Sequence, residues 1–156
     1  MRDANYNCQV LEKMQGELFS NYMRYEICSP LIFIRRFMYS DLAKRFDNQT
    51  VLLESSSIQL MVDEINAQYG VTNYGKVESI NTEALFWVGS LLRHWCFTYE
   101  IRSKLLVAMI DIKKIINRYP LYHSMDFDYA IKRIIEEDKI RIDRKDILEI
   151  IKELEK

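Results

Sequence analysis

The amino-acid sequence predicts an all-α fold: a compact single domain, residues 1–156, in which seven or eight helices surround a central apolar helix. Three observations lead to this prediction. Apolar residues recur every three or four positions along most of the chain, and only 4 glycines and 2 prolines occur in 156 residues. The segment at about 82–100 is apolar on every side, and a helix of that kind normally lies at the centre of a bundle.

Three helices are expected in the N-terminal half of the chain. The first is predicted over residues 6–27, where apolar residues follow helical spacing. The second is predicted over residues 30–46, because Ser29 is a favoured N-cap and proline is favoured in the first turn. The third follows the serines at 55–57 and ends at Gly70, since glycine suits a helix C-terminus.

The central helix is expected to follow Asn81 and to run to about residue 100. Residues 71–81 form the longest predicted loop, and a short strand at 76–78 would have no evident partner. Gly89 costs about 1 kcal/mol of helix propensity within the central helix. We therefore expect a neighbouring helix to approach closely at Gly89.

Four shorter helices are predicted in the C-terminal third. Two of them cover residues 103–110 and 111–119, and the second ends at a proline. Asp126 is expected to cap the next helix and Asp143 to cap the last. The last helix, at 143–156, has a narrow apolar stripe and alternating charges, which are typical of a solvated helix or of one that associates with another chain, as in a homodimer.

The charge balance and the hydropathy pattern exclude several classes of function. The chain has 22 Lys and Arg against 23 Asp and Glu, a net charge of −1, so binding of nucleic acid by bulk positive charge is not favoured. The N-terminus has no apolar signal region, and no apolar stretch is long enough to span a membrane. A cytoplasmic protein is expected.

Metal-binding patterns are absent from the sequence. Cys8, Cys28 and Cys96 are widely separated, and the only histidines are His94 and His123. A structural zinc site needs four nitrogen or sulfur ligands, usually in two close pairs. The sequence therefore predicts buried thiols and neither a metal nor an organic cofactor.

Arg93 is a charged residue inside the most apolar predicted helix. Leaving its charge unpaired in the interior would cost several kcal/mol, so an ion pair with a carboxylate is the simplest expectation. The alternative is a polar pocket that Arg93 shares with Trp95, Tyr99 and Arg102.

Arg118 and His123 have the Arg-x4-His spacing of the HEPN ribonucleases, and the pair resembles the motif of that family. The resemblance implies that the histidine is a general base towards the 2′-hydroxyl and that the arginine stabilises the phosphorane charge. Pro120 interrupts the helix between the two residues. The structural alternative is an arginine at a helix end and a histidine that binds backbone groups or Asp126.

Residues 98–118 can also be interpreted as a helix-turn-helix, with helices at 103–109 and 111–118. Lysine and arginine are frequent in this segment, but its turn lacks the usual glycine. The start of the second helix offers no Asn, Gln or Ser to read base edges. DNA binding is therefore a further alternative.

Two runs, YGKVESINTEALFWVGSLLRHWCFTYEI and RYPLYHSMDFDYAIKRIIEE, are similar to small bacterial proteins of toxin–antitoxin-like loci on mobile elements. In that family an aromatic helix with an Arg-x-Trp centre precedes a Tyr-His-Ser-x-Asp connector and an Ala-Ile-rich helix. Here Arg93 and Trp95 match the first element, and residues 122–126 match the second. The resemblance covers residues 74–137.

The resemblance implies a non-enzymatic, antitoxin-like component that binds a toxin, a phage protein or a host protein. The 10 Tyr, 7 Phe and 2 Trp are consistent with a partner-facing surface, because aromatic residues are enriched at binding hot spots. The connector between the helices is the best local candidate. Its predicted partner-binding residues are Arg118, Tyr119, Tyr122, His123 and Asp126.

Overall fold

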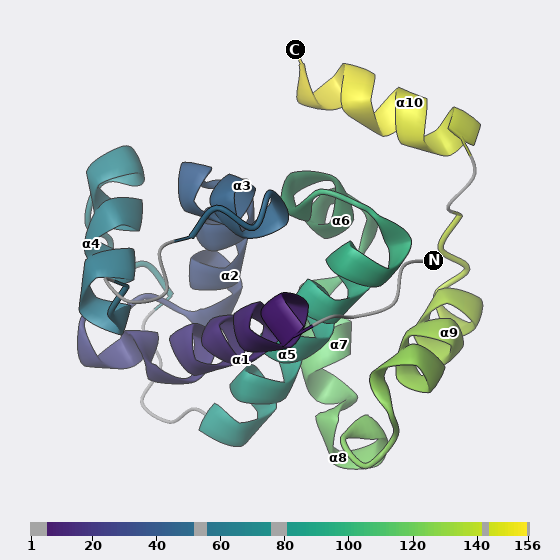
Figure 1. Cartoon of the computed structure of the whole chain (residues 1–156), viewed down its shortest axis with the longest axis horizontal. Helices are drawn as coiled ribbons and strands as arrows, with labels where there is room; N and C mark the ends of the chain where they lie inside the picture. Colours follow the sequence, from purple (N-terminus) through teal and green to yellow (C-terminus); the bar gives the residue numbers. More distant parts are fainter. Residues whose placement is uncertain (1–5, 52–55, 76–80, 142–143, 156) are drawn as a thin grey trace.

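Ten α-helices and one short 3-10 helix make up the part of the chain that the computed structural model describes, residues 6–51, 56–75, 81–141 and 144–155 (Figure 1). This part contains no strand, so the predicted all-α class is confirmed. The strand considered at 76–78 and the cap at Asp143 lie outside the described residues. The elements are α1 (Tyr6–Asn21), η1 (Tyr22–Arg24), α2 (Pro30–Tyr39), α3 (Asp41–Asp47), α4 (Ile58–Tyr69), α5 (Thr82–Tyr99), α6 (Ser103–Met109), α7 (Ile112–Asn117), α8 (Tyr119–Tyr122), α9 (Phe127–Glu137) and α10 (Arg144–Leu154).

Side-chain caps begin several helices at the predicted positions. Ser29, Ser57, Asn81 and Asp126 each accept, through a side-chain oxygen, the N–H of the residue three positions later, at 3.0 to 3.3 Å. Each cap satisfies a backbone donor that has no partner within the helix. Gly70 follows α4 with a φ of +87°, a conformation that glycine adopts without strain.

The first helix is shorter than the predicted range of 6–27, because the chain turns at Tyr22. The carbonyl oxygen of Tyr22 accepts the N–H groups of Tyr25 and Glu26 at 2.9 and 3.0 Å. The Tyr22 hydroxyl is buried and donates to the carbonyl of Cys28 at 2.7 Å. These bonds replace the next helical turn with a 3-10 turn.

The helix predicted over 30–46 is divided into α2 and α3 at Ser40. The Ser40 hydroxyl donates to the carbonyl of Phe37 at 2.6 Å and accepts the N–H of Ala43 at 3.1 Å. One side chain therefore ends one helix and caps the next. This division adds α3 to the predicted helices, and α8 is a second addition. Helix α8 is a single turn with Pro120 in its first positions, where a proline causes no loss of a helical hydrogen bond.

The central position of α5 is confirmed, and α1 packs along it with the most extensive contact in the fold. Gly89 is the point of close approach, as predicted. A Cβ atom at Gly89 would lie 2.7 Å from the carbonyl oxygen of Gln15 and 2.9 Å from the Cα of Gly16. The Gln15 amide donates to the carbonyl of Gly89 at 3.0 Å and fixes the register of the two helices.

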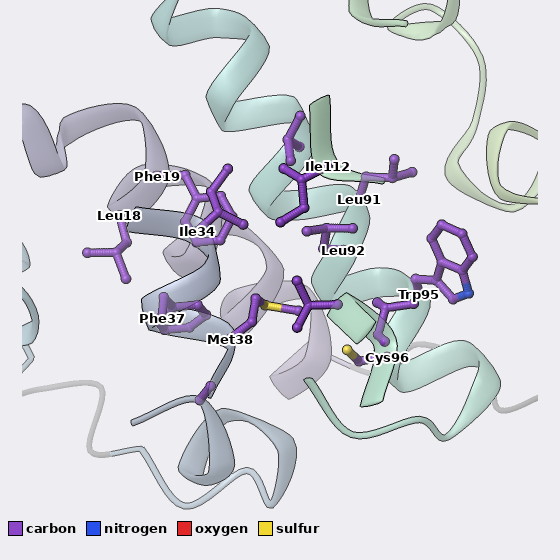
Figure 2. Close-up of a cluster of buried hydrophobic side chains, with 14 of the residues drawn as sticks. Leu18, Phe19, Ile34, Phe37, Met38, Leu91, Leu92, Trp95, Cys96 and Ile112 are labelled. Carbon is purple, nitrogen blue, oxygen red and sulfur yellow. The ribbon is translucent and has the colours of Figure 1, made fainter. Parts of the chain in front are cut away.

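Helices from several parts of the chain contribute to the core around α5. Buried side chains of α1, α2, α5 and α7 converge there, and Figure 2 labels ten of them. These residues are Leu18, Phe19, Ile34, Phe37, Met38, Leu91, Leu92, Trp95, Cys96 and Ile112.

Helix α10 lies at the periphery of the molecule. In Figure 1 it lies beyond α6, which it contacts. Ile150 and Ile151 pack partly against the core, while Leu148 is 48% exposed. The association of this helix with another chain stays a prediction.

Candidate partner-binding furrow

Arg93 forms a buried ion pair, which is the simpler of the two arrangements expected for it. Its side chain is fully buried, and Nη1 lies 2.5 Å from Oδ1 of Asp47 at the end of α3. Nε donates to Gln15 and Nη2 donates to Ser103, both at 2.7 Å. The guanidinium thus joins α1, α3, α5 and α6, and all three of its nitrogens have partners.

The polar pocket considered for Arg93 is not assembled in the structure. Trp95 is fully buried, and its ring centre lies 6.5 Å from that of Tyr99. Arg102 is exposed and lines recesses near α3 and α6, including one of about 340 Å³ beside α10. None of five recesses among the described residues is lined by more than one of these four residues.

Two of the five predicted partner-binding residues point inward. Arg118 binds both carboxylate oxygens of Asp138, with Nη1 2.9 Å from Oδ2, and its Nε lies 3.5 Å from Glu137. The hydrogen bond from Arg118 lowers the pKa of Asp138. Tyr122 is only 5% exposed and donates its hydroxyl to Glu137. Carboxylates at the end of α9 therefore bind the polar groups of both Arg118 and Tyr122.

Tyr119 and His123 lie on another side of the same turn. The His123 Nδ1–H donates to the carbonyl of Tyr119 at 2.9 Å, and the Tyr119 hydroxyl donates to Glu83 at 3.3 Å. The Tyr119 ring meets Trp87 edge-on at 6.0 Å. His123 lines a recess on this side that Arg118 does not line, and the Arg118 guanidinium binds Asp138 and Glu137 instead.

One stripe of α5 forms the floor of three adjoining recesses. The stripe consists of Glu83, Phe86, Trp87, Ser90 and His94, at helical positions i, i+3, i+4, i+7 and i+11. Helix α1 lines the two outer recesses, through Gln9 and Glu12 in one and Ser20 and Asn21 in the other, whereas α8, α9 and the turn between them line the central recess beside the stripe. We call this surface the furrow.

The central recess of the furrow is the most apolar and has a volume of about 610 Å³. A recess of about 520 Å³ shares Glu83 and Phe86 with it, and a recess of about 470 Å³ shares Asp126 and Phe127 with it. The central recess is lined by Glu83, Phe86, Trp87, Ser90, Tyr119, His123, Met125, Asp126 and Phe127.

His94 joins three helices at one end of the furrow. Its Nδ1 lies 2.8 Å from Glu12 of α1, and its Nε2 lies 2.7 Å from Asp128 of α9. A neutral imidazole has one N–H, so two carboxylate partners require the doubly protonated ring. Burial lowers the pKa of His94, but the hydrogen bonds to Glu12 and Asp128 raise it more, and the net pKa is raised.

The sequence prediction missed the floor of the furrow. Phe86 is 37% exposed, although it lies in the most apolar helix. A signal was present, because Glu83, Ser90 and His94 place polar groups along the same stripe as Phe86. Such a mixed stripe indicates a face that other helices do not cover completely.

The remaining features of the described residues give little indication of chemistry. No group of three or more His, Cys, Asp or Glu side chains in these residues could hold a metal ion, and none of their helices is long and apolar enough to cross a lipid bilayer. Cys8, Cys28 and Cys96 are buried and form no disulfide. Burial raises the pKa of Cys28 and of Cys96 to about 11, so both are protonated thiols at neutral pH.

No protein-family model, curated protein or solved structure matches the chain.

Proposed function

We propose that this chain is a non-enzymatic helical module that binds a protein partner through the furrow. The observation that carries the proposal is the composition of the central recess. Phe86, Trp87, Tyr119 and Phe127 surround it, and they stand on helices or at a helix end. Aromatic side chains dominate binding hot spots because they bury a large area at low entropic cost.

The resemblance to toxin–antitoxin-associated proteins supports a narrower form of this proposal. The similar segment, residues 74–137, includes α5, α8 and α9, which form the floor and one wall of the furrow. In this form the chain is an antitoxin-like or phage-defence component in the cytoplasm. Its partner is a toxin, a phage protein or a host protein, and it acts by stoichiometric binding.

Ribonuclease activity is less well supported by the geometry. Arg118 is held by Asp138 and does not line the recess that contains His123. A general base and a charge-stabilising group must act on one phosphate, which requires both at a single site.

Capture of partners by matched variants tests the proposal. Phe86→Glu places a charge on the floor of the furrow, and Leu60→Glu places one at an exposed apolar position on α4, away from the furrow. We expect the wild type and Leu60→Glu to retain the same proteins from a lysate of the native host, and Phe86→Glu to lose them while its circular dichroism is unchanged.

Two results contradict the proposal. One is retention of the same partners by Phe86→Glu as by the wild type. The other is cleavage of RNA by the purified wild type that is lost in His123→Ala, which would establish the ribonuclease alternative.

A further inference from the structure

We infer that the occupant of the furrow is an amphipathic helix that places Lys or Arg at positions i and i+7 and apolar residues at i+3 and i+4. This inference rests on the proposed function and specifies the chemistry of the partner. It follows from the length of the furrow, the nature of its walls and the positions of its carboxylates.

The dimensions of the furrow fit a helix. Its floor runs along α5 from Glu83 to His94, a span of about 16 Å at 1.5 Å per residue, or three helical turns. Helix α1 lines the outer recesses, and α8 and the start of α9 line the central recess beside α5. A trough between helices accepts the side-chain ridge of another helix, and the described part of the chain offers no strand edge for β-augmentation.

The central recess selects an apolar anchor. Phe86 is exposed at its floor, and Met125 and Phe127 are partly buried beside it. Two adjacent apolar residues of a partner helix, at i+3 and i+4, would fill this space. Removal of their surface and that of Phe86 from water provides the main driving force.

Two carboxylates stand at opposite ends of the central recess. Glu83 is shared with the recess on one side, and Asp126 is shared with the recess on the other. Within the described residues neither has an ion-pair partner: Glu83 accepts the Tyr119 hydroxyl, and Asp126 caps α9. The central recess contains no Lys or Arg.

The length of the central recess sets the spacing of the partner's cations, because Glu83 and Asp126 are the carboxylates it shares with the recesses at its two ends. The α5 residues of the central recess extend from Glu83 to Ser90, which is seven residues or about 10 Å. Cations at i and i+7 of a bound helix are separated by the same rise and lie on one face with i+3 and i+4. Arg24 and Lys132 line only the outer recesses. The carboxylates of Glu83 and Asp126 therefore have no Lys or Arg beside them in the lining of the central recess.

Three synthetic helical peptides on one alanine- and glutamine-rich framework test the inference. The first carries Lys at i and i+7 and Leu at i+3 and i+4. The second has Glu in place of Lys, and the third has the same composition as the first with its lysines on the opposite face. Binding is followed through the indole N–H signals of the two tryptophans, because Trp87 lines the furrow whereas Trp95 is fully buried.

We expect the first peptide to bind at least tenfold more tightly than the other two at low ionic strength and to shift the Trp87 signal. The preference should disappear in the double variant Glu83→Gln, Asp126→Asn. Asparagine keeps the N-cap of α9, so this variant removes charge without removing the cap. Added salt should reduce the preference, because the pairs lie at the rim.

Several outcomes overturn the inference. Equal binding of the first two peptides, or tighter binding of the glutamate peptide, shows that charge does not select the occupant. Failure of all three peptides, while Phe86→Glu still abolishes partner capture, rejects the helical motif and leaves the proposed function in place. If the chain self-associates and Phe86→Glu abolishes that self-association, the occupant of the furrow is a second copy of the chain. Capture that is insensitive to Phe86→Glu rejects the proposed function itself.

Discussion

Replacement of Asp47 by alanine should destabilise the fold strongly, because it leaves the guanidinium of Arg93 without a counter-charge. Arg93 is fully buried, and the Asp47 side chain is 9% exposed. Without this carboxylate the buried guanidinium keeps Gln15 and Ser103 as hydrogen-bond partners but has no anion beside it. Ser103 also loses an acceptor, since its backbone N–H and its hydroxyl both donate to Asp47, at 3.0 and 2.6 Å.

The expected loss of unfolding free energy is about 3–5 kcal/mol, the usual result of removing one member of a buried ion pair. This is a large part of the roughly 5–15 kcal/mol that stabilises a typical domain. A chain of 156 residues should show a fall in Tm of about 6–20 °C, at roughly 2–4 °C per kcal/mol.

Urea unfolding followed by far-ultraviolet circular dichroism measures this loss. A double-mutant cycle with Arg93→Met isolates the pair, and we expect a coupling energy of about 2–3 kcal/mol. The Arg45–Glu64 pair is the matched control, because it has the same chemistry but its side chains are 42% and 41% exposed. Glu64→Ala should cost less than about 1 kcal/mol.

Two results would refute this reasoning about Arg93. One is a loss below about 1 kcal/mol in Asp47→Ala, similar to that of the surface control. The other is additivity of the Asp47→Ala and Arg93→Met effects within about 0.5 kcal/mol, which would mean that the two groups act independently.

The other two predictions concern His94 and the contact between α1 and α5. Because folding raises the pKa of His94 above its ordinary 6.5, its stabilising effect should be complete below about pH 6.5 and should be lost as pH rises through the raised pKa. Urea midpoints measured between pH 5.5 and 9 should show this decline in the wild type and a smaller one in His94→Gln, and identical profiles would contradict it. Gly89→Ala should destabilise the fold by about 1–3 kcal/mol, because the new Cβ would meet the backbone of Gln15 and Gly16. This loss should exceed the gain from the higher helix propensity of alanine. Thermal melts measure the change, and a stabilised variant would show that the two helices can separate at little cost.

Local patterns in the sequence predicted most of the helices, but they missed the turn at Tyr22, the break at Ser40 and the short helix α8. The apolar composition of α5 predicted its central position, and Gly89 predicted the close approach of a neighbour. Ser40 was missed because residues 30–46 keep one amphipathic pattern across it. The signal was the Ser40-Asp41 pair, which is typical of a helix start.

The site was less predictable because it depends on contacts between distant parts of the chain. The sequence required a partner for Arg93, but Asp47 is 46 residues away, and many other carboxylates were available. Tyr122 was predicted to face a partner, and it is buried because the end of α9 returns to cover it. The furrow is formed by α1, α5 and the α8–α9 turn, and no local pattern indicates which of their faces meet.

The packing of α1 against α5 also has a consequence for how the chain reaches its native state. Gln15 and Gly89 are 74 residues apart, and closing a flexible loop of that length costs roughly 4 kcal/mol of chain entropy. Helical proteins usually fold fast because their contacts are local, and here the main helix pair is non-local. During synthesis α1 leaves the ribosome long before α5, so the apolar side of α1 stays without its partner until more than half of the chain has emerged. We expect folding of this protein to be slow for an all-helical chain and to depend on the late arrival of α5.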